Sequence, residues 1–268
     1  MRVDRAVVLV LLAAVFLLPA CSPSGPQVDP EVEANWTWLT ENKERLDSLR
    51  AELAEVEALR KAPAAEPAGD AEAAQGEPQA SAQELAARAG ELDKTLTELA
   101  DEFSGKLTAF LNDPRNQILE GEPLTERQQA AIRMKSSEDV NFAAEYIDKG
   151  GDYRRAIDIL TMAASLDPDN AEVQAALADA EANRFMSEER FAAAKKGMTQ
   201  DQVRDVLGQV NLRNIREYPE RGVVAWFYAT AEGGAAAAVW FRENKKTAEL
   251  EVYQLKYDAV SGSGESTE

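Results

Sequence analysis

The chain contains no histidine, a single cysteine and few aromatic residues, although 45% of its 268 residues are hydrophobic. Without histidine it lacks the side chain that titrates near neutral pH and the commonest metal ligand, which weakens the case for a Ser-His nucleophile or a zinc site. One cysteine cannot form a disulfide within the chain. Its acidic pairs are typical of solvated helix faces, and its glycines lack the spacing of a phosphate loop. We therefore expect no enzymatic activity, no metal and no cofactor.

Basic residues are also scarce. The sequence has 29 Lys and Arg against 48 Asp and Glu, which gives a formal net charge of -19. Binding to nucleic acid rests largely on Lys and Arg side chains that neutralise phosphates. A surface with this excess of negative charge repels the phosphate backbone, so nucleic acid is excluded as an expected partner.

The N-terminus has the pattern of an export signal. Arg2 and Arg5 precede an uninterrupted apolar run over residues 6–18. This run is shorter than the roughly 20 apolar residues that a membrane-spanning helix needs. A charged start, a short apolar run and small residues after it are typical of a secretory signal peptide.

The only cysteine follows this run directly. Residues 18–21, Leu-Pro-Ala-Cys, resemble a bacterial lipobox. The resemblance implies that Cys21 is lipidated and becomes the first residue of the mature protein, which is then held at the membrane by its acyl chains. Ser22 after the cysteine implies sorting to the outer membrane, with the body of the protein in the periplasm. The alternative is an ordinary signal peptide or short membrane anchor with a free thiol.

Two helices are predicted beyond a tether rich in Pro, Ser and Gly. Apolar residues recur at three, four or seven positions over 31–61, and again at three or four positions from Leu92 to Phe110. This spacing is typical of narrow helical stripes. The stripes either pack on each other as a hairpin or hold the helix of a partner or of a second copy. Trp36 and Trp38 lie in the first helix, where they either pack within the hairpin or contact the membrane surface.

The segment that follows resembles a tetratricopeptide repeat, a family of paired antiparallel helices. Residues 151–157 (GDYRRAI) separate two predicted helices, and residues 166–170 (LDPDN) end the second one. The match places the small residues Ala144 and Ala156 where the helices cross, and Pro168 where the second helix stops. Such a unit implies a helical scaffold for protein partners without naming the partner.

A mixed helix and strand pattern follows the repeat. Short helices are predicted near residues 187–191 and 199–207, and strands over 222–230, 236–242 and 247–257. The Gly-Met-Thr at 197–199, the Leu-Gly at 207–208, and Trp226 and Tyr228 on the next strand resemble the SmpA/OmlA (BamE-like) family of small outer-membrane lipoproteins. Val210 departs from this family, in which a proline is common after the Leu-Gly turn. The resemblance implies a small ααβββ domain.

These patterns together predict an α+β protein: an N-terminal helical region, coiled-coil-like and then repeat-like, precedes the ααβββ domain. The expected organisation is a signal peptide at 1–20, a lipid-anchored tether at 21–30, a helix at 31–61, a disordered Ala/Pro/Glu linker at 62–80, a helical region at 81–135, the repeat-like unit at 136–185, the SmpA/OmlA-like domain at 186–258 and a flexible tail at 259–268.

The expected function is that of a non-enzymatic scaffold for protein partners at the outer membrane, in envelope or outer-membrane protein assembly, with self-association through the helical region as a further option. The alternative is an inhibitor or a module that binds an envelope ligand through its C-terminal sheet. Arg and aromatic side chains dominate interface energies, and core packing is the alternative for each aromatic. The expected contact residues are Tyr153, Arg154, Arg155, Trp226, Tyr228 and Trp240.

Overall fold

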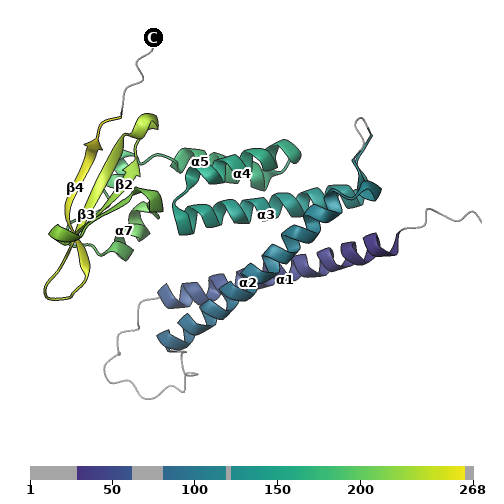
Figure 1. Ribbon diagram of the computed structural model, residues 1–268, viewed down its shortest axis with the longest axis horizontal. Helices are drawn as coiled ribbons and strands as arrows, with labels where there is room; N and C mark the ends of the chain where they lie inside the picture. Colours follow the sequence, from purple (N-terminus) through teal and green to yellow (C-terminus); the bar gives the residue numbers. More distant parts are fainter. Residues whose placement is uncertain (1–28, 62–80, 119–121, 263–268) are drawn as a thin grey trace, which may run out of the picture.

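The computed structural model describes residues 29–61, 81–118 and 122–262. The predicted signal peptide, Cys21, the linker at 62–80 and most of the tether and tail lie outside these ranges. The described chain is α+β: helices come first, and a four-stranded antiparallel sheet lies at its C-terminal end (Figure 1). Within the described ranges, no helix has both the length and the apolar character needed to cross a membrane.

The first two helices form an antiparallel hairpin. Helix α1 spans Pro30–Lys61 and α2 spans Ala82–Leu111, where Ser81 and Glu84 form a capping box. The two predicted stripes meet within this hairpin, which agrees with the first of the two alternatives. Both tryptophans of α1 also pack on α2, with ring centroids 5.2 Å apart for Trp36 and Phe110 and 6.3 Å apart for Trp38 and Phe103. The buried side chains of this core are Val32, Leu39, Leu46, Leu99, Phe103, Leu107, Phe110 and Ala131.

Helix α3 spans Glu126–Gly150 and belongs to two cores. Ala131, near its start, is buried in the hairpin core, whereas Ala143 is buried against the helix that follows. The predicted boundary between residues 135 and 136 therefore falls inside one continuous helix. The repeat pattern could not show this, because it marks where a family unit starts and not where the helix starts.

Helix α4 spans Tyr153–Leu166 and packs antiparallel to α3. Asp152 caps α4 by accepting a hydrogen bond from the backbone N–H of Arg155 at 3.2 Å. Ala143 and Ala156 are buried where the two helices cross. Ala144, which the sequence pattern places at this crossing, is exposed. A shift of one residue turns the side chain by about 100° around a helix, so Ala143 takes the expected place.

The remaining elements complete the repeat-like unit and the C-terminal domain. Four strands form the sheet. The sequence pattern marks ranges for only three of them, because β1 is only four residues long and shows no alternating pattern. The strands pair in the order β1-β2-β3-β4, each antiparallel to the next. These elements are α5 (Ala171–Asn183), α6 (Glu188–Phe191), α7 (Gln200–Leu207), β1 (Ile215–Tyr218), β2 (Val223–Ala229), β3 (Ala236–Glu243) and β4 (Leu250–Val260).

One face of the sheet forms the core of the C-terminal domain. Trp226 and Phe241 lie on this inner face, with ring centroids 4.6 Å apart, and they pack with Phe191 of α6 and Leu207 of α7. Figure 1 shows α7 and the helices α3 to α5 on the same side of the sheet. The opposite face is called the outer face below.

A buried ion pair ties the hairpin to α3. Glu138 of α3 is 3% exposed, and both of its carboxylate oxygens accept hydrogen bonds from Arg50 of α1, at 2.9 and 2.6 Å. The ammonium group of Lys43 lies 3.7 Å from the same carboxylate. Two parallel N–H···O bonds fix both distance and orientation, so this pair sets how α1 crosses α3.

A glycine sets the contact between the helices and the C-terminal domain. Gly151 ends α3 with φ of 61°, in the left-handed region. A Cβ atom at this position would lie 2.5 Å from the backbone N of Asn211 and 2.6 Å from the carbonyl oxygen of Gln209. Only glycine fits both the backbone angle and this close approach.

We predict that Gly151→Ala lowers the free energy of unfolding by about 2 kcal/mol or more, because the added methyl meets backbone and the φ angle is strained. Gly105→Ala in α2 is the matched control, since nothing lies within 4 Å of its Cβ position, and it should stabilise the protein by about 0.5–1 kcal/mol. Urea unfolding followed by circular dichroism measures both. Equal effects from the two changes would show that the close contact at Gly151 is not formed.

We also predict that Glu138→Gln destabilises the protein by about 2 kcal/mol, because it removes the buried carboxylate from its two hydrogen bonds with Arg50 and leaves that half-buried guanidinium only the exposed Asp47, at 3.5 Å. Glu57→Gln removes the partner of Arg60 from an exposed ion pair within α1 and should change stability by less than about 1 kcal/mol. Urea unfolding of the two variants tests this difference. A cost for Glu138→Gln as small as that of Glu57→Gln would contradict a buried, orienting ion pair.

Candidate interaction site

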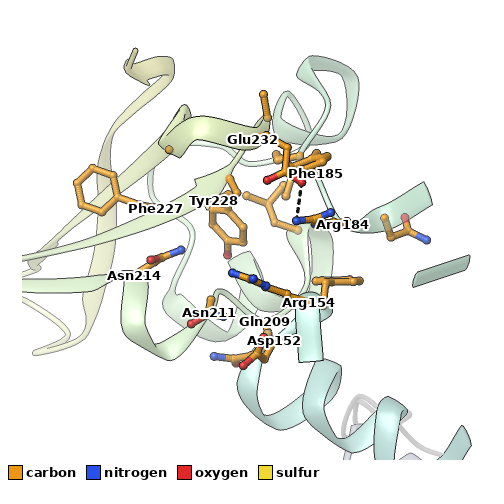
Figure 2. Close-up of a pocket in the computed structure, with 18 of the residues that line it drawn as sticks. Asp152, Arg154, Arg184, Phe185, Gln209, Asn211, Asn214, Phe227, Tyr228 and Glu232 are labelled. Carbon is orange, nitrogen blue, oxygen red and sulfur yellow. Dashed lines mark ion pairs between the residues drawn. The ribbon is translucent and has the colours of Figure 1, made fainter. Parts of the chain in front are cut away.

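A cavity of about 230 Å³ lies where the helices meet the sheet domain (Figure 2). Its walls come from the turn between α3 and α4, the end of α5, the segment after α7 and the end of β2. We call it the junction cavity. Because elements far apart in the sequence build it, its shape depends on how closely the two parts of the chain pack.

Backbone contacts hold the segment after α5 against β2. The N–H of Met186 donates to the carbonyl oxygen of Ala229 at 2.7 Å. The carbonyl oxygen of Met186 accepts a hydrogen bond from the Tyr257 hydroxyl at 3.0 Å. With Gly151 packed on the other side, these bonds fix two walls of the junction cavity.

Two of the three arginines that line the cavity already have partners. Arg190 donates to the carbonyl oxygens of Asn183 at 3.3 Å and of Leu207 at 3.1 Å, so it links α5 to the end of α7. Arg184 forms an ion pair with Glu232 at 2.6 Å (Figure 2). These two guanidinium groups therefore brace the walls.

Arg154 differs from them. It is exposed, and its side chain makes no hydrogen bond or ion pair with any residue that the structure describes. Figure 2 shows its guanidinium group pointing into the cavity, below the hydroxyl of Tyr228. The side-chain amide of Asn214 points to the same place from the far wall, and over the described residues it too forms no hydrogen bond. The N–H groups of the Arg154 guanidinium and of the Asn214 amide thus both face the junction cavity.

Tyr228 forms the roof of the cavity and is 6% exposed. Its hydroxyl donates to the carbonyl oxygen of Gly208 at 3.2 Å. Burial raises the pKa of this phenol well above its usual range, and the positive charges of Arg204 and Arg190 offset only part of that effect. The group therefore stays a neutral hydrogen-bonding hydroxyl at physiological pH.

The six predicted contact residues fall into four places. Tyr153, Arg154 and Tyr228 line the junction cavity together. Arg155 is exposed on α4, with its guanidinium carbon 6.0 Å from the centre of the Tyr146 ring. Trp226 is 2% exposed in the core, which is the alternative that the sequence allows for each aromatic residue. Trp240 is half-buried on the outer face, 6.3 Å from Phe227.

Several residues of the cavity have no signal in the sequence. Arg190 sits in α6, which the Ser187 side chain caps by accepting a hydrogen bond from the backbone N–H of Arg190. The amides come from the irregular segment before β1, where no motif marks them. The adjacent Arg184 and Phe185 are the exception, since an Arg next to an aromatic residue in a loop is typical of interfaces. The residues that sequence reasoning missed are Asp152, Arg184, Phe185, Arg190, Gln209, Asn211 and Asn214.

The chemistry of the cavity is that of binding. It offers a guanidinium group, amides and a neutral phenol beside apolar side chains, which is the usual make-up of a recognition site. In the described part of the chain, no group of three or more Cys, Asp or Glu side chains is arranged to hold a metal ion. Comparisons with models of protein families, with curated proteins and with solved structures found no match to this chain.

The raised pKa of Tyr228 leads to a prediction about alkaline stability. The folded state holds this proton more tightly than the unfolded state, in which the phenol ionises near pH 10. The stability that depends on the neutral phenol is therefore present below about pH 10 and is lost as pH rises above it. We expect the stability difference between the wild type and Tyr228→Phe to shift in favour of the variant from about pH 9 to about pH 11.

Urea unfolding at the two pH values measures this shift. Tyr253→Phe, which removes a phenol from the outer face, controls for general alkaline effects. A difference between the wild type and Tyr228→Phe that stays constant over this range would show that Tyr228 is not buried as described.

Proposed function

We propose that the protein is a lipoprotein of the outer membrane, anchored through lipidated Cys21 and facing the periplasm, and that it acts as a non-enzymatic scaffold for protein partners in envelope or outer-membrane protein assembly. One observation carries the scaffold role. The junction cavity joins the repeat-like helices to the sheet domain and brings together Tyr153, Arg154 and Tyr228, which come from two separate sequence motifs.

The two family resemblances are part of this proposal. Paired antiparallel helices on either side of Gly151, with small buried residues at their crossing, support a tetratricopeptide-like unit. Two short helices before an antiparallel sheet support an SmpA/OmlA-like domain. Thr199 caps α7 in a capping box with Gln202, and Gly208 ends that helix with φ of 82°. In this proposal α6, α7 and the strands β2, β3 and β4 form the ααβββ unit, and β1 is an extra strand at the edge beside β2.

Direct evidence for anchoring and partners would come from crosslinking in intact bacterial cells. We expect the wild type to fractionate with the outer membrane and to capture a fixed set of proteins, including components of outer-membrane protein assembly. Cys21→Ser should move to the soluble periplasmic fraction and lose those partners, because a single residue carries the proposed anchor. Recovery of Cys21→Ser in the outer membrane at the level of the wild type would contradict the lipid anchor.

The outer face of the sheet favours a second candidate function, that of an inhibitor or of a module that binds an envelope ligand. Trp240 and Phe227 meet there edge to face, with interplanar angle 77°, and Arg242 lies 4.3 Å from the ring centre of Tyr253. Aromatic side chains beside Arg on a partly exposed sheet face are a common recognition surface.

Retention on purified peptidoglycan separates the two functions. If the protein is an envelope-ligand module, peptidoglycan should retain the wild type but not Trp240→Ala. The scaffold role instead predicts no retention, with capture of protein partners unaffected by Trp240→Ala.

A further inference from the structure

We propose that the junction cavity binds the C-terminal carboxylate of an extended peptide whose last side chain is apolar or aromatic. This inference deepens the proposed scaffold function and rests on it, because it specifies what kind of protein segment the scaffold holds.

The charge of the cavity fits a group with one negative charge. Its lining holds the guanidinium groups of Arg154, Arg184 and Arg190 and the carboxylates of Asp152 and Glu232. These groups leave a single excess positive charge. A phosphate monoester carries nearly two negative charges at neutral pH, so part of its charge would have no counterpart. A carboxylate matches the excess.

The free donors have the geometry that a carboxylate needs. The Arg154 guanidinium is a planar fork that can give two parallel N–H···O bonds to one carboxylate. It has no competing partner among the described residues, so binding breaks no existing ion pair. The Asn214 amide and the Arg154 guanidinium point toward the same space (Figure 2), which lets them contact one anionic group together.

Part of the remaining wall is apolar, beside the polar side chains of Asn183, Gln209 and Asn211. Phe185 and Phe227 are half-buried at the cavity, and Leu207 and Met186 are buried behind it. A C-terminal residue carries its carboxylate and its side chain on the same Cα, so an anionic and an apolar group enter side by side. A Glu or Asp side chain within a peptide has no apolar group beside its carboxylate. This pairing favours a chain end.

The size of the cavity agrees with a chain end. Its volume of about 230 Å³ is below the roughly 300–1,000 Å³ typical of pockets that enclose a drug-sized molecule. The bracing of its walls by Arg184 and Arg190 keeps it formed without a ligand, which lowers the ordering cost of binding. A peptide end would enter a site that is already shaped.

The test uses the full chain in detergent and a labelled pentapeptide, Ser-Ala-Ser-Ala-Phe, followed by fluorescence anisotropy. The free acid should bind the wild type at least tenfold more tightly than the C-terminal amide. Arg154→Ala should weaken binding of the free acid at least tenfold, and Arg154→Lys less, because lysine keeps the charge but not the fork. Arg45→Ala, an exposed arginine of α1, should leave binding unchanged.

Four results would overturn the inference. The acid and the amide could bind equally, or neither could bind. An amidated peptide that ends in Glu could bind as tightly as the free acid, which would assign the site to acidic side chains. Inorganic phosphate could displace the peptide at equal affinity, which would make it a general anion site. If the wild type does not bind the peptide but still captures the crosslinked partners, the peptide inference fails and the proposed function stands. If the wild type captures no partners, the proposed function itself is refuted.

Discussion

The fit of one backbone against another at Gly151 determines the arrangement of the molecule. With no side chain there, the turn between α3 and α4 approaches the backbone of residues 209–211 to a distance that a methyl group would occupy. The second Cα hydrogen of glycine is small enough for this approach, whereas the Cβ of any other residue would prevent it. The junction cavity exists because this contact closes one side of the interface while the larger side chains around Arg154 and Tyr228 hold the other side open.

Polar contacts orient the helices, whereas apolar burial holds them together. In a chain with net charge -19, Arg50 of α1 still pairs with Glu138 of α3, whose carboxylate is buried. The desolvation of such a pair can cost as much as its Coulomb attraction returns, so its main contribution is the geometry that it imposes. The aromatic packing of Trp36 and Trp38 on α2 supplies the burial. The two effects are separable: the ion pair sets the angle at which α1 crosses α3, and the aromatic packing supplies most of the free energy of folding in this region.

The sequence predicts local elements well and their assembly poorly. The heptad-like spacing in α1, the start of α7 at Thr199 and the break before α4 at residue 151 depend on neighbours within a few positions, so pattern reasoning finds them. Gly151 was visible as a turn, but its contact with Gln209 and Asn211 crosses more than fifty residues and leaves no local trace. The cavity shows the same limit: Tyr153, Arg154 and Tyr228 were expected as contacts, whereas their meeting with Asn214 depends on tertiary packing.

Helix α3 is shared between the hairpin core and the repeat-like core, and this has a consequence for unfolding. At 1.5 Å per residue its 25 residues form a rod about 37 Å long, with Ala131 buried at one end and Ala143 nearer the other. If either core unfolds, half of α3 loses the side-chain packing that stabilises it. The two helical regions are therefore coupled and belong to one cooperative unit instead of two independent ones. The position of the junction cavity is thereby linked to the state of the hairpin at the far end of α3.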